Sequence, residues 1–154
     1  MVFTGVVTSP NHPANYPDSL ERTQTLQVEE GLILSLQFIA FNIERESIYH
    51  SDMEYKSACL YDHLTITDGD GTTLMGKSCG STSDGNIVIE GESIFKSIGS
   101  SLPANVTSRS NMVNLIFSTN VYNAKSGWNV SWTAVTPGKP HNISLMVGWY
   151  FLSS

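Results

Sequence analysis

The segment Asp68-Gly69-Asp70-Gly71 is the part of the chain whose spacing comes nearest to a known chemistry, because alternating aspartates open the calcium loops of EF-hand proteins. Such a loop also needs further oxygen ligands and a glutamate at its end. The residues that follow supply neither in the required pattern. The segment therefore predicts a hairpin turn between two strands and not a metal loop.

No catalytic constellation is present in the sequence. The four histidines, His12, His50, His63 and His141, are far apart along the chain, and none belongs to a His-Glu-x-x-His zinc motif. No serine stands in a Gly-x-Ser-x-Gly nucleophile elbow. His63 alternates with apolar Leu64 in a predicted strand, so we expect the histidine to face solvent. These observations favour a non-catalytic protein over an independent enzyme.

The charge of the chain limits the partners that it can bind. With 8 Lys and Arg against 14 Asp and Glu, the formal net charge of the 154 residues is −6. The basic residues form no cluster, which argues against a surface that follows nucleic acid phosphates. An acidic surface instead favours cations or the basic groups of a partner. The length suffices for one domain with a hydrophobic core.

Cysteines and glycosylation sequons indicate the compartment. Cys59 and Cys79 are the two cysteines, and no neighbouring cysteine or histidine completes a zinc pattern. Three sequons begin at Asn105, Asn129 and Asn142. Together with the even number of cysteines they favour a secreted, extracellular protein. The alternative is a cytosolic domain with two free, buried thiols.

The two ends of the chain show no clear targeting pattern. Met1 is followed by no basic and apolar leader, so we expect the signal peptide to be absent from this chain. The apolar tail 144–154 is shorter than the ~20 residues that span a bilayer, so it is no clear membrane segment. Pro137-Gly138-Lys139-Pro140 predicts a boundary between a domain at 1–136 and a linker and tail at 137–154.

Apolar and polar residues alternate with a period of two in four segments, which is the pattern of half-buried strands. These segments lie at about 32–38, 64–67, 112–117 and 128–134. Asn129 falls on the polar face of the last segment, where a glycan is tolerated. Glu30-Gly31 predicts a further hairpin turn. Short strands joined by polar turns predict an all-β fold, an antiparallel two-sheet sandwich.

Two segments are longer than a hairpin requires, and long loops on a β scaffold often carry function. They run from about 45 to 58 and from about 81 to 101. Within the second, the segment 90–98 predicts a short helix. Tyr49 in the first loop and Ile89 in the second are candidate partner contacts, with local packing as the alternative.

An ordered set of motifs resembles the CUB domain family over about residues 5–135. In chain order the motifs are Gly5 to Pro13 with Tyr16-Pro17, Phe38 to Glu44, Cys59-Leu60-Tyr61-Asp62-His63-Leu64, Cys79-Gly80, and Gly127-Trp128 through Ala134-Val135. The resemblance implies a jelly-roll-like sandwich with a Cys59–Cys79 disulfide. Family members commonly carry an earlier disulfide as well, and Arg22 stands at one of its positions here. In lacking this earlier disulfide, the chain resembles the first CUB domains of complement-type proteases.

The resemblance also implies a calcium site. The ligands that many CUB domains use correspond to Glu44, Asp62 and Asn120, with the Tyr122 carbonyl and the Asn123 side chain. Carboxylate and carbonyl oxygens suit calcium. The family has Asp where this chain has Asn120, which supplies an oxygen without a charge and predicts weaker binding. The alternative is a metal-free domain in which these residues only accept hydrogen bonds.

In the family, calcium-held carboxylates receive a basic side chain from a protein partner. The resemblance therefore implies that Glu44 and Asp62, flanked by Tyr61 and Tyr49, bind an extracellular protein or a glycan. A metal-fixed carboxylate is already ordered, so its charge-assisted hydrogen bond costs less entropy. The alternative from a different class is an assembly module that mediates dimerisation without a metal. In either case the chain would be part of a secreted multidomain protein, such as a protease.

Overall fold

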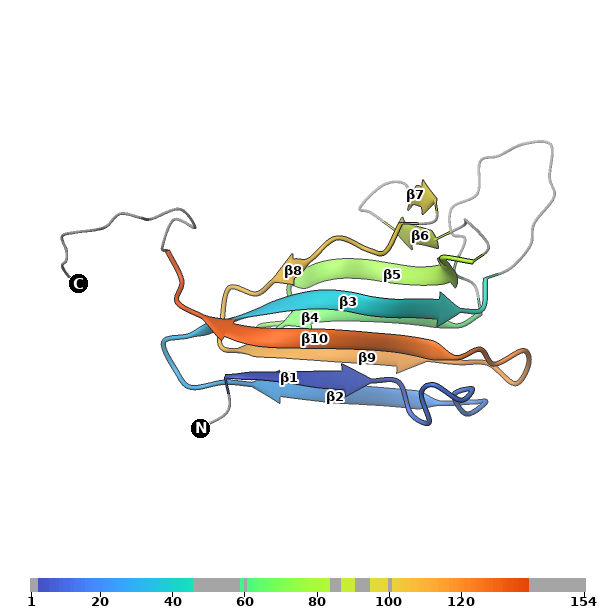
Figure 1. Ribbon diagram of the computed structural model, residues 1–154, viewed down its shortest axis with the longest axis horizontal. Helices are drawn as coiled ribbons and strands as arrows, with labels where there is room; N and C mark the ends of the chain where they lie inside the picture. Colours follow the sequence, from blue (N-terminus) through green and yellow to red (C-terminus); the bar gives the residue numbers. More distant parts are fainter. Residues whose placement is uncertain are drawn as a thin grey trace.

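The structure is a computed structural model, and it describes residues 3–45, 59, 61–83, 87–90, 95–99 and 101–138. The described residues form ten strands and no helix (Figure 1). In chain order these are β1 (Thr4–Thr8), β2 (Glu21–Gln27), β3 (Ile33–Ile43), β4 (His63–Asp68), β5 (Thr73–Ser81), β6 (Ile87–Glu90), β7 (Phe95–Gly99), β8 (Val106–Thr107), β9 (Met112–Ser118) and β10 (Gly127–Val135).

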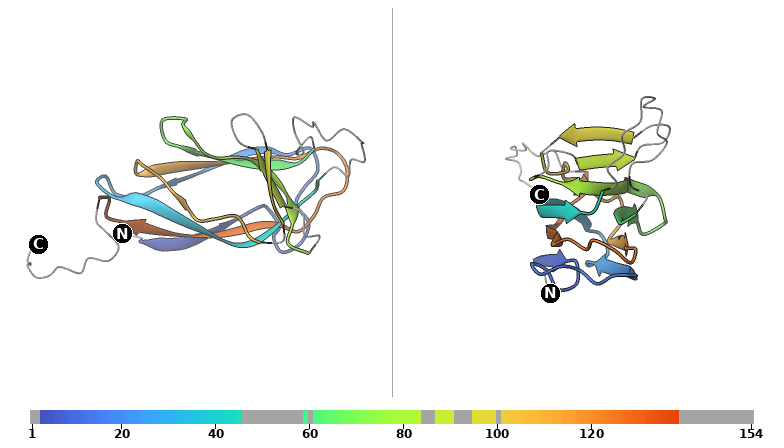
Figure 2. Two further views of the ribbon diagram at one scale, coloured as in Figure 1. Left: turned by 90° about the horizontal axis from the view of Figure 1, so that it is seen from above. Right: turned by 90° about the vertical axis from the view of Figure 1, so that its right-hand side faces the viewer.

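The strands form two facing layers that are joined along one side (Figures 1 and 2). The order of neighbours is β1-β10-β3-β5-β4-β9-β2, and every recorded pairing is antiparallel. β5 makes the join, because it pairs with β4 along its length and with the end of β3 at Gly80 and Ser81. The predicted all-β, antiparallel, two-sheet fold is confirmed.

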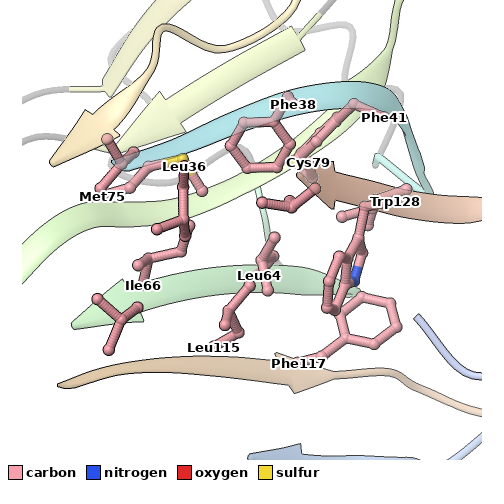
Figure 3. Close-up of a cluster of buried hydrophobic side chains, with 14 of the residues drawn as sticks. Leu36, Phe38, Phe41, Leu64, Ile66, Met75, Cys79, Leu115, Phe117 and Trp128 are labelled. Atoms are coloured by element: carbon pink, nitrogen blue, oxygen red, sulfur yellow. The ribbon is translucent and has the colours of Figure 1, made fainter. Parts of the chain in front are cut away.

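The core lies between the two layers, where the alternating apolar residues meet (Figure 3). Leu36 and Phe38 of β3 face Leu64 of β4 and Leu115 of β9, and all four are at most 3% exposed. Each such side chain contributes about 1.5–3 kcal/mol through burial. The predicted alternation is confirmed in β3, β4, β9 and β10.

Aromatic rings fill one end of this core. Phe117 of β9 packs edge-to-face against Trp128 of β10, with ring centres 5.8 Å apart, and against Tyr16, at 4.9 Å. All three rings are buried. Edge-to-face pairs place the positive edge of one ring on the negative face of another, which fixes their orientation as well as burying area. These ring contacts therefore hold Tyr16, which belongs to the connection between β1 and β2, against the sandwich.

The disulfide implied by the family resemblance is present between Cys59 and Cys79, so both cysteines of the chain are bonded. Cys79 is fully buried on β5, and Cys59 precedes β4. The bond closes a segment of 20 residues and is worth about 3 kcal/mol by loop entropy. It ties the entry into β4 to the strand that joins the two sheets.

One predicted element of secondary structure is wrong. The predicted helix at 90–98 is replaced by strands β6 and β7, which pair antiparallel from Ile87 opposite Gly99 to Glu90 opposite Phe95. The β-branched run Ile87-Val88-Ile89 extends the sheet beyond β5, and this pairing outweighs local preference.

The turns give a mixed result. The turn at Asp68–Gly71 joins paired strands, and the Gly71 N–H donates to the Asp68 carbonyl at 2.9 Å, which confirms the hairpin. The turn at Glu30-Gly31 also forms, with Leu32 N–H donating to Glu29. It is no hairpin, because it leads from β2 in one layer to β3 in the other.

Several predictions lie outside the described residues. These are the tail at 139–154 with its sequon at Asn142, and Tyr49 with most of the first long loop. The domain boundary at about 136 stays a prediction, although β10 ends just before it at Val135. In the described part of the chain, no helix has the length and apolar character needed to cross a membrane.

Gly127 begins β10 with a backbone conformation that other residues avoid, at φ 87°. A side chain here would overlap the hydroxyl of Ser9, which accepts the Trp128 N–H at 3.0 Å. Gly31 shares the positive φ, at 98°, but has open space around it. A substitution at Gly31 would therefore cause backbone strain alone, whereas one at Gly127 would cause both backbone strain and steric overlap.

We expect Gly31→Ala to lower the free energy of unfolding by about 1 kcal/mol through backbone strain alone. Gly127→Ala should cost about 1–3 kcal/mol more, because a well-packed site must also accommodate an extra methyl group. Urea unfolding of both variants measures the difference. Equal losses would show that the contact between Ser9 and Trp128 does not anchor β10.

Candidate functional site

Three strand ends meet at one end of the sandwich and bring together residues that are distant in sequence. Glu44 follows β3, Asp62 precedes β4, and Asn120 comes two residues after β9. Antiparallel pairing places the start of β4 beside the end of β9, with His63 opposite Ser118. β5 connects this edge to the end of β3. The fold thus gathers the residues that the family resemblance assigns to calcium.

Tyr16 connects the two carboxylates. Its hydroxyl donates to Asp62 Oδ2 at 2.6 Å and accepts the backbone N–H of Glu44 at 3.1 Å. The side chain is 2% exposed, and burial together with the hydrogen bond to Asp62 raises the pKa of the phenol. The hydroxyl therefore stays protonated and keeps its role as a donor. The proline-rich motif around Tyr16-Pro17 marked this residue in the sequence, but its role at the site was not predicted.

Both carboxylates are buried, but only Asp62 has a hydrogen bond to each of its oxygens. Asp62 is fully buried, and its second oxygen, Oδ1, accepts the Asn120 N–H at 2.7 Å. Glu44 is 7% exposed, and its Oε2 accepts the amide of Asn123 at 3.0 Å. Glu44 Oε1 is buried and finds no hydrogen-bond donor among the described residues. An acceptor left in this state costs about 1–3 kcal/mol unless another group satisfies it.

The electrostatics of the site disfavour two negative charges. Burial is the main cause that raises the pKa of Glu44, and the charge of Asp62 adds to it. Burial also raises the pKa of Asp62, against the lowering effect of hydrogen bonds from Tyr16 and Asn120, and the nearby charge of Asp18 adds a smaller rise. A bound cation would relieve both the burial cost and the repulsion.

The side-chain chemistry at this end fits a calcium ion in part. Two carboxylates and the unsatisfied Glu44 Oε1 are hard oxygen ligands of the kind that calcium prefers. Asn120 Oδ1 accepts the Tyr122 N–H at 3.0 Å, and its second lone pair could still face an ion. Among the described residues, no three Asp, Glu, His or Cys side chains gather into a metal-binding group. Backbone carbonyls, amides and water would have to complete the shell.

The surface around the carboxylates is apolar. Tyr61, Val121 and Tyr122 are 41%, 54% and 67% exposed, and they adjoin Asp62 and Asn120 in sequence. Exposed apolar side chains that gather beside polar groups are typical of interaction sites. Val121 was not singled out in the sequence, because a lone valine in a loop carries no pattern.

His63 lies on the face of β4 opposite the buried Leu64, as predicted, but it is only partly exposed to solvent. It is half-buried, and its Nδ1 is buried without a hydrogen-bond partner in the described structure. Burial, helped by the nearby charge of Lys77, lowers the pKa of the imidazole. The alternation within one strand predicts the face of a residue but not the extent to which its surroundings bury it.

The two described sequons occupy different surroundings. Asn129 lies on the outer face of β10 between buried Trp128 and Val130, which confirms its predicted face. Asn105 is exposed just before β8. Glycosylation at either position stays a prediction.

The buried carboxylates predict a definite pH dependence for the metal-free protein. Because the folded state raises the pKa of Glu44 above its ordinary value of about 4, the folded state binds more protons than the unfolded state above that pH. The contribution of Glu44 to the free energy of unfolding should therefore fall as the pH rises above about 4, and the wild type should lose more stability over this rise than Glu44→Gln. Urea unfolding in a chelator measures it. A difference between the two proteins that does not change with pH would contradict the assignment.

Comparison with known proteins begins with the family. The model described as CUB domain matches residues 3–97, more than half of the chain. Cubilin of Rattus norvegicus is 28% identical over 132 residues, which cover 86% of this chain and 3% of cubilin. Mannan-binding lectin serine protease 1 of Mus musculus is 28% identical over 131 residues, which cover 85% of this chain and 15% of the protease. The chain thus spans a small part of the curated relatives it matches.

Solved structures agree with this result. The MASP-1 CUB2 domain bound to Ca2+ superimposes with a TM-score of 0.61 at 26% identity, and the match covers 86% of this chain and 94% of that domain. The extracellular region of zebrafish Gpr126/Adgrg6 gives a TM-score of 0.61 at 23% identity. The match covers 88% of this chain and 14% of that region, and it shows a shared fold. Fold, disulfide and matched sequence lead to one conclusion: the chain belongs to the CUB domain family.

Proposed function

We propose that this chain is an extracellular, non-catalytic binding module that recognises a basic group of its partner through a calcium-stabilised pair of carboxylates. The observation that carries this proposal is the buried, unsatisfied Glu44 Oε1 beside the buried Asp62. Relatives of the chain include cubilin, mannan-binding lectin serine protease 1 and neuropilin-2. These relatives support an extracellular location.

Calcium would be held by Glu44 and Asp62, with Asn120, the Tyr122 carbonyl and Asn123 as further ligands. The ion would supply positive charge at a place where burial disfavours two ionised carboxylates. The Tyr16 hydroxyl and the Asn120 N–H already orient Asp62, so ion binding would not need to order that side chain. The likeness to a CUB domain solved with Ca2+ supports this ion in particular.

The partner would present a lysine or arginine side chain. A carboxylate fixed by hydrogen bonds and a metal accepts a charge-assisted bond without losing further entropy. The exposed side chains of Tyr61, Val121 and Tyr122 would pack on the aliphatic part of the incoming side chain. A net charge of −6 favours the approach of such a basic partner.

Calcium binding is tested by calorimetric titration of the chain. We expect a dissociation constant near the millimolar level of extracellular modules, because only two carboxylates contribute charge. Asn120→Asp should bind calcium about tenfold more tightly, and Glu44→Gln should lose the binding. Asp70→Asn, an exposed acid in the turn between β4 and β5, is the matched control. No heat at millimolar calcium in both the wild type and Asn120→Asp would overturn the calcium site.

Recognition of a basic partner is tested with an immobilised lysine-rich peptide. We expect binding in calcium that is lost in chelator, lost in Asp62→Asn, and weakened about tenfold in Tyr122→Ser. Val6→Ser, which removes an equally exposed apolar residue from β1, should bind normally. Light scattering of the same variants distinguishes recognition from assembly, since a dimer that dissociates in Asp62→Asn would favour the assembly module.

A further inference from the structure

A groove of about 830 Å³ lies on the flank of β5, away from the carboxylate site. Its walls include Thr72 in the turn between β4 and β5, whereas Asp62 stands at the opposite end of β4. β6 and the segment that leads into β8 close its other sides. The volume falls within the range of about 300–1,000 Å³ that small-molecule sites occupy.

The groove combines an apolar base with a polar rim. Leu74, Ile89 and Val106 line it, and all three also pack against the hydrophobic core. Thr73 and Lys77 line it from exposed positions on β5. An apolar surface bordered by hydroxyl and amino groups suits a pyranose ring, which has an apolar C–H face and hydroxyl groups around its edge.

A potential N-glycosylation site lies in the wall of this groove. Asn105 lines it, is exposed, and opens the sequon Asn105-Val106-Thr107. Val106 is 8% exposed and points inward, so its two neighbours in this extended segment point outward. Thr107 is also exposed and pairs with Ser35 of β3, which holds the sequon in place.

We propose that Asn105 carries an N-linked glycan whose innermost sugars fold back into this groove. The covalent link holds the sugars at an effective concentration of about millimolar, so weak contacts with Leu74 and Ile89 suffice to seat them. The proposal rests on the extracellular location given above and does not depend on calcium. It also implies that the groove is covered by the chain's own glycan, which leaves the Glu44 and Asp62 end as the surface for partners.

The test uses the full chain secreted from animal cells and an endoglycosidase that cuts between the first two sugars. We expect mass spectrometry to show a glycan on Asn105 that is trimmed about tenfold more slowly in the folded protein than after denaturation, which corresponds to about 1.4 kcal/mol of protection. An unmodified Asn105, or equal trimming rates, would overturn the proposal.

Two variants separate the groove from general folding effects. Thr73→Trp fills the groove from an exposed strand position and should restore fast trimming in the folded protein. Thr23→Trp, at an exposed position on β2 outside the groove, is the matched control and should stay slow. Slow trimming in both variants would overturn the proposal. The proposal would also be overturned if Asn105→Gln formed a dimer and the added substitution Thr73→Trp dissociated it, because a second chain would then occupy the groove. Calcium titration of Asn105→Gln should match the wild type, so the two proposals fail independently.

Discussion

The hydroxyl of Tyr16 is the point at which the fold and the candidate site depend on each other. It donates to Asp62 and accepts from the backbone of Glu44, and its ring is fixed by Phe117. The Tyr16 N–H in turn donates to the carbonyl of Lys125, which precedes β10. Connections from four parts of the chain therefore converge on one residue. A side chain without this hydroxyl would leave a buried carboxylate oxygen and a backbone N–H without their partner.

β5 and the disulfide make that convergence possible. Because β5 pairs with β4 and with the end of β3, it fixes the distance between the strand that precedes Glu44 and the strand that follows Asp62. The disulfide attaches Cys59, which lies three residues before Asp62, to Cys79 on β5. The carboxylates are thus carried by the rigid part of the sandwich, even though both lie just outside regular strands. A site supported in this way is preorganised for a ligand.

The strands could be predicted because a buried face repeats every two residues, as Leu34, Leu36 and Phe38 show. The partner of each strand could not, since pairing depends on distant residues. For this reason the local sequence predicts a hairpin at Glu30-Gly31, where the chain crosses between layers, and a helix at 90–98, where β6 and β7 form. The family motifs located Glu44 and Asp62. The role of Tyr16 had no local signal, because its hydrogen bond joins residues 46 positions apart.

The opposite ends of β4 show that burial alone does not mark a metal site. Asp62 and Asp68 are both nearly inaccessible, at 0% and 2% exposure. Burial tends to raise the pKa of Asp68, but hydrogen bonds from Ser110, Arg109 and Gly69 outweigh it and lower that pKa. Asp68 is therefore stable as an anion that closes a turn. Burial raises the pKa of Asp62, because fewer hydrogen-bond donors oppose it there, and the nearby charge of Asp18 adds a smaller rise. The two aspartates differ in the number of hydrogen-bond donors around them, and only Asp62 lies beside a second buried carboxylate with an unsatisfied oxygen, Glu44 Oε1, which a cation would stabilise.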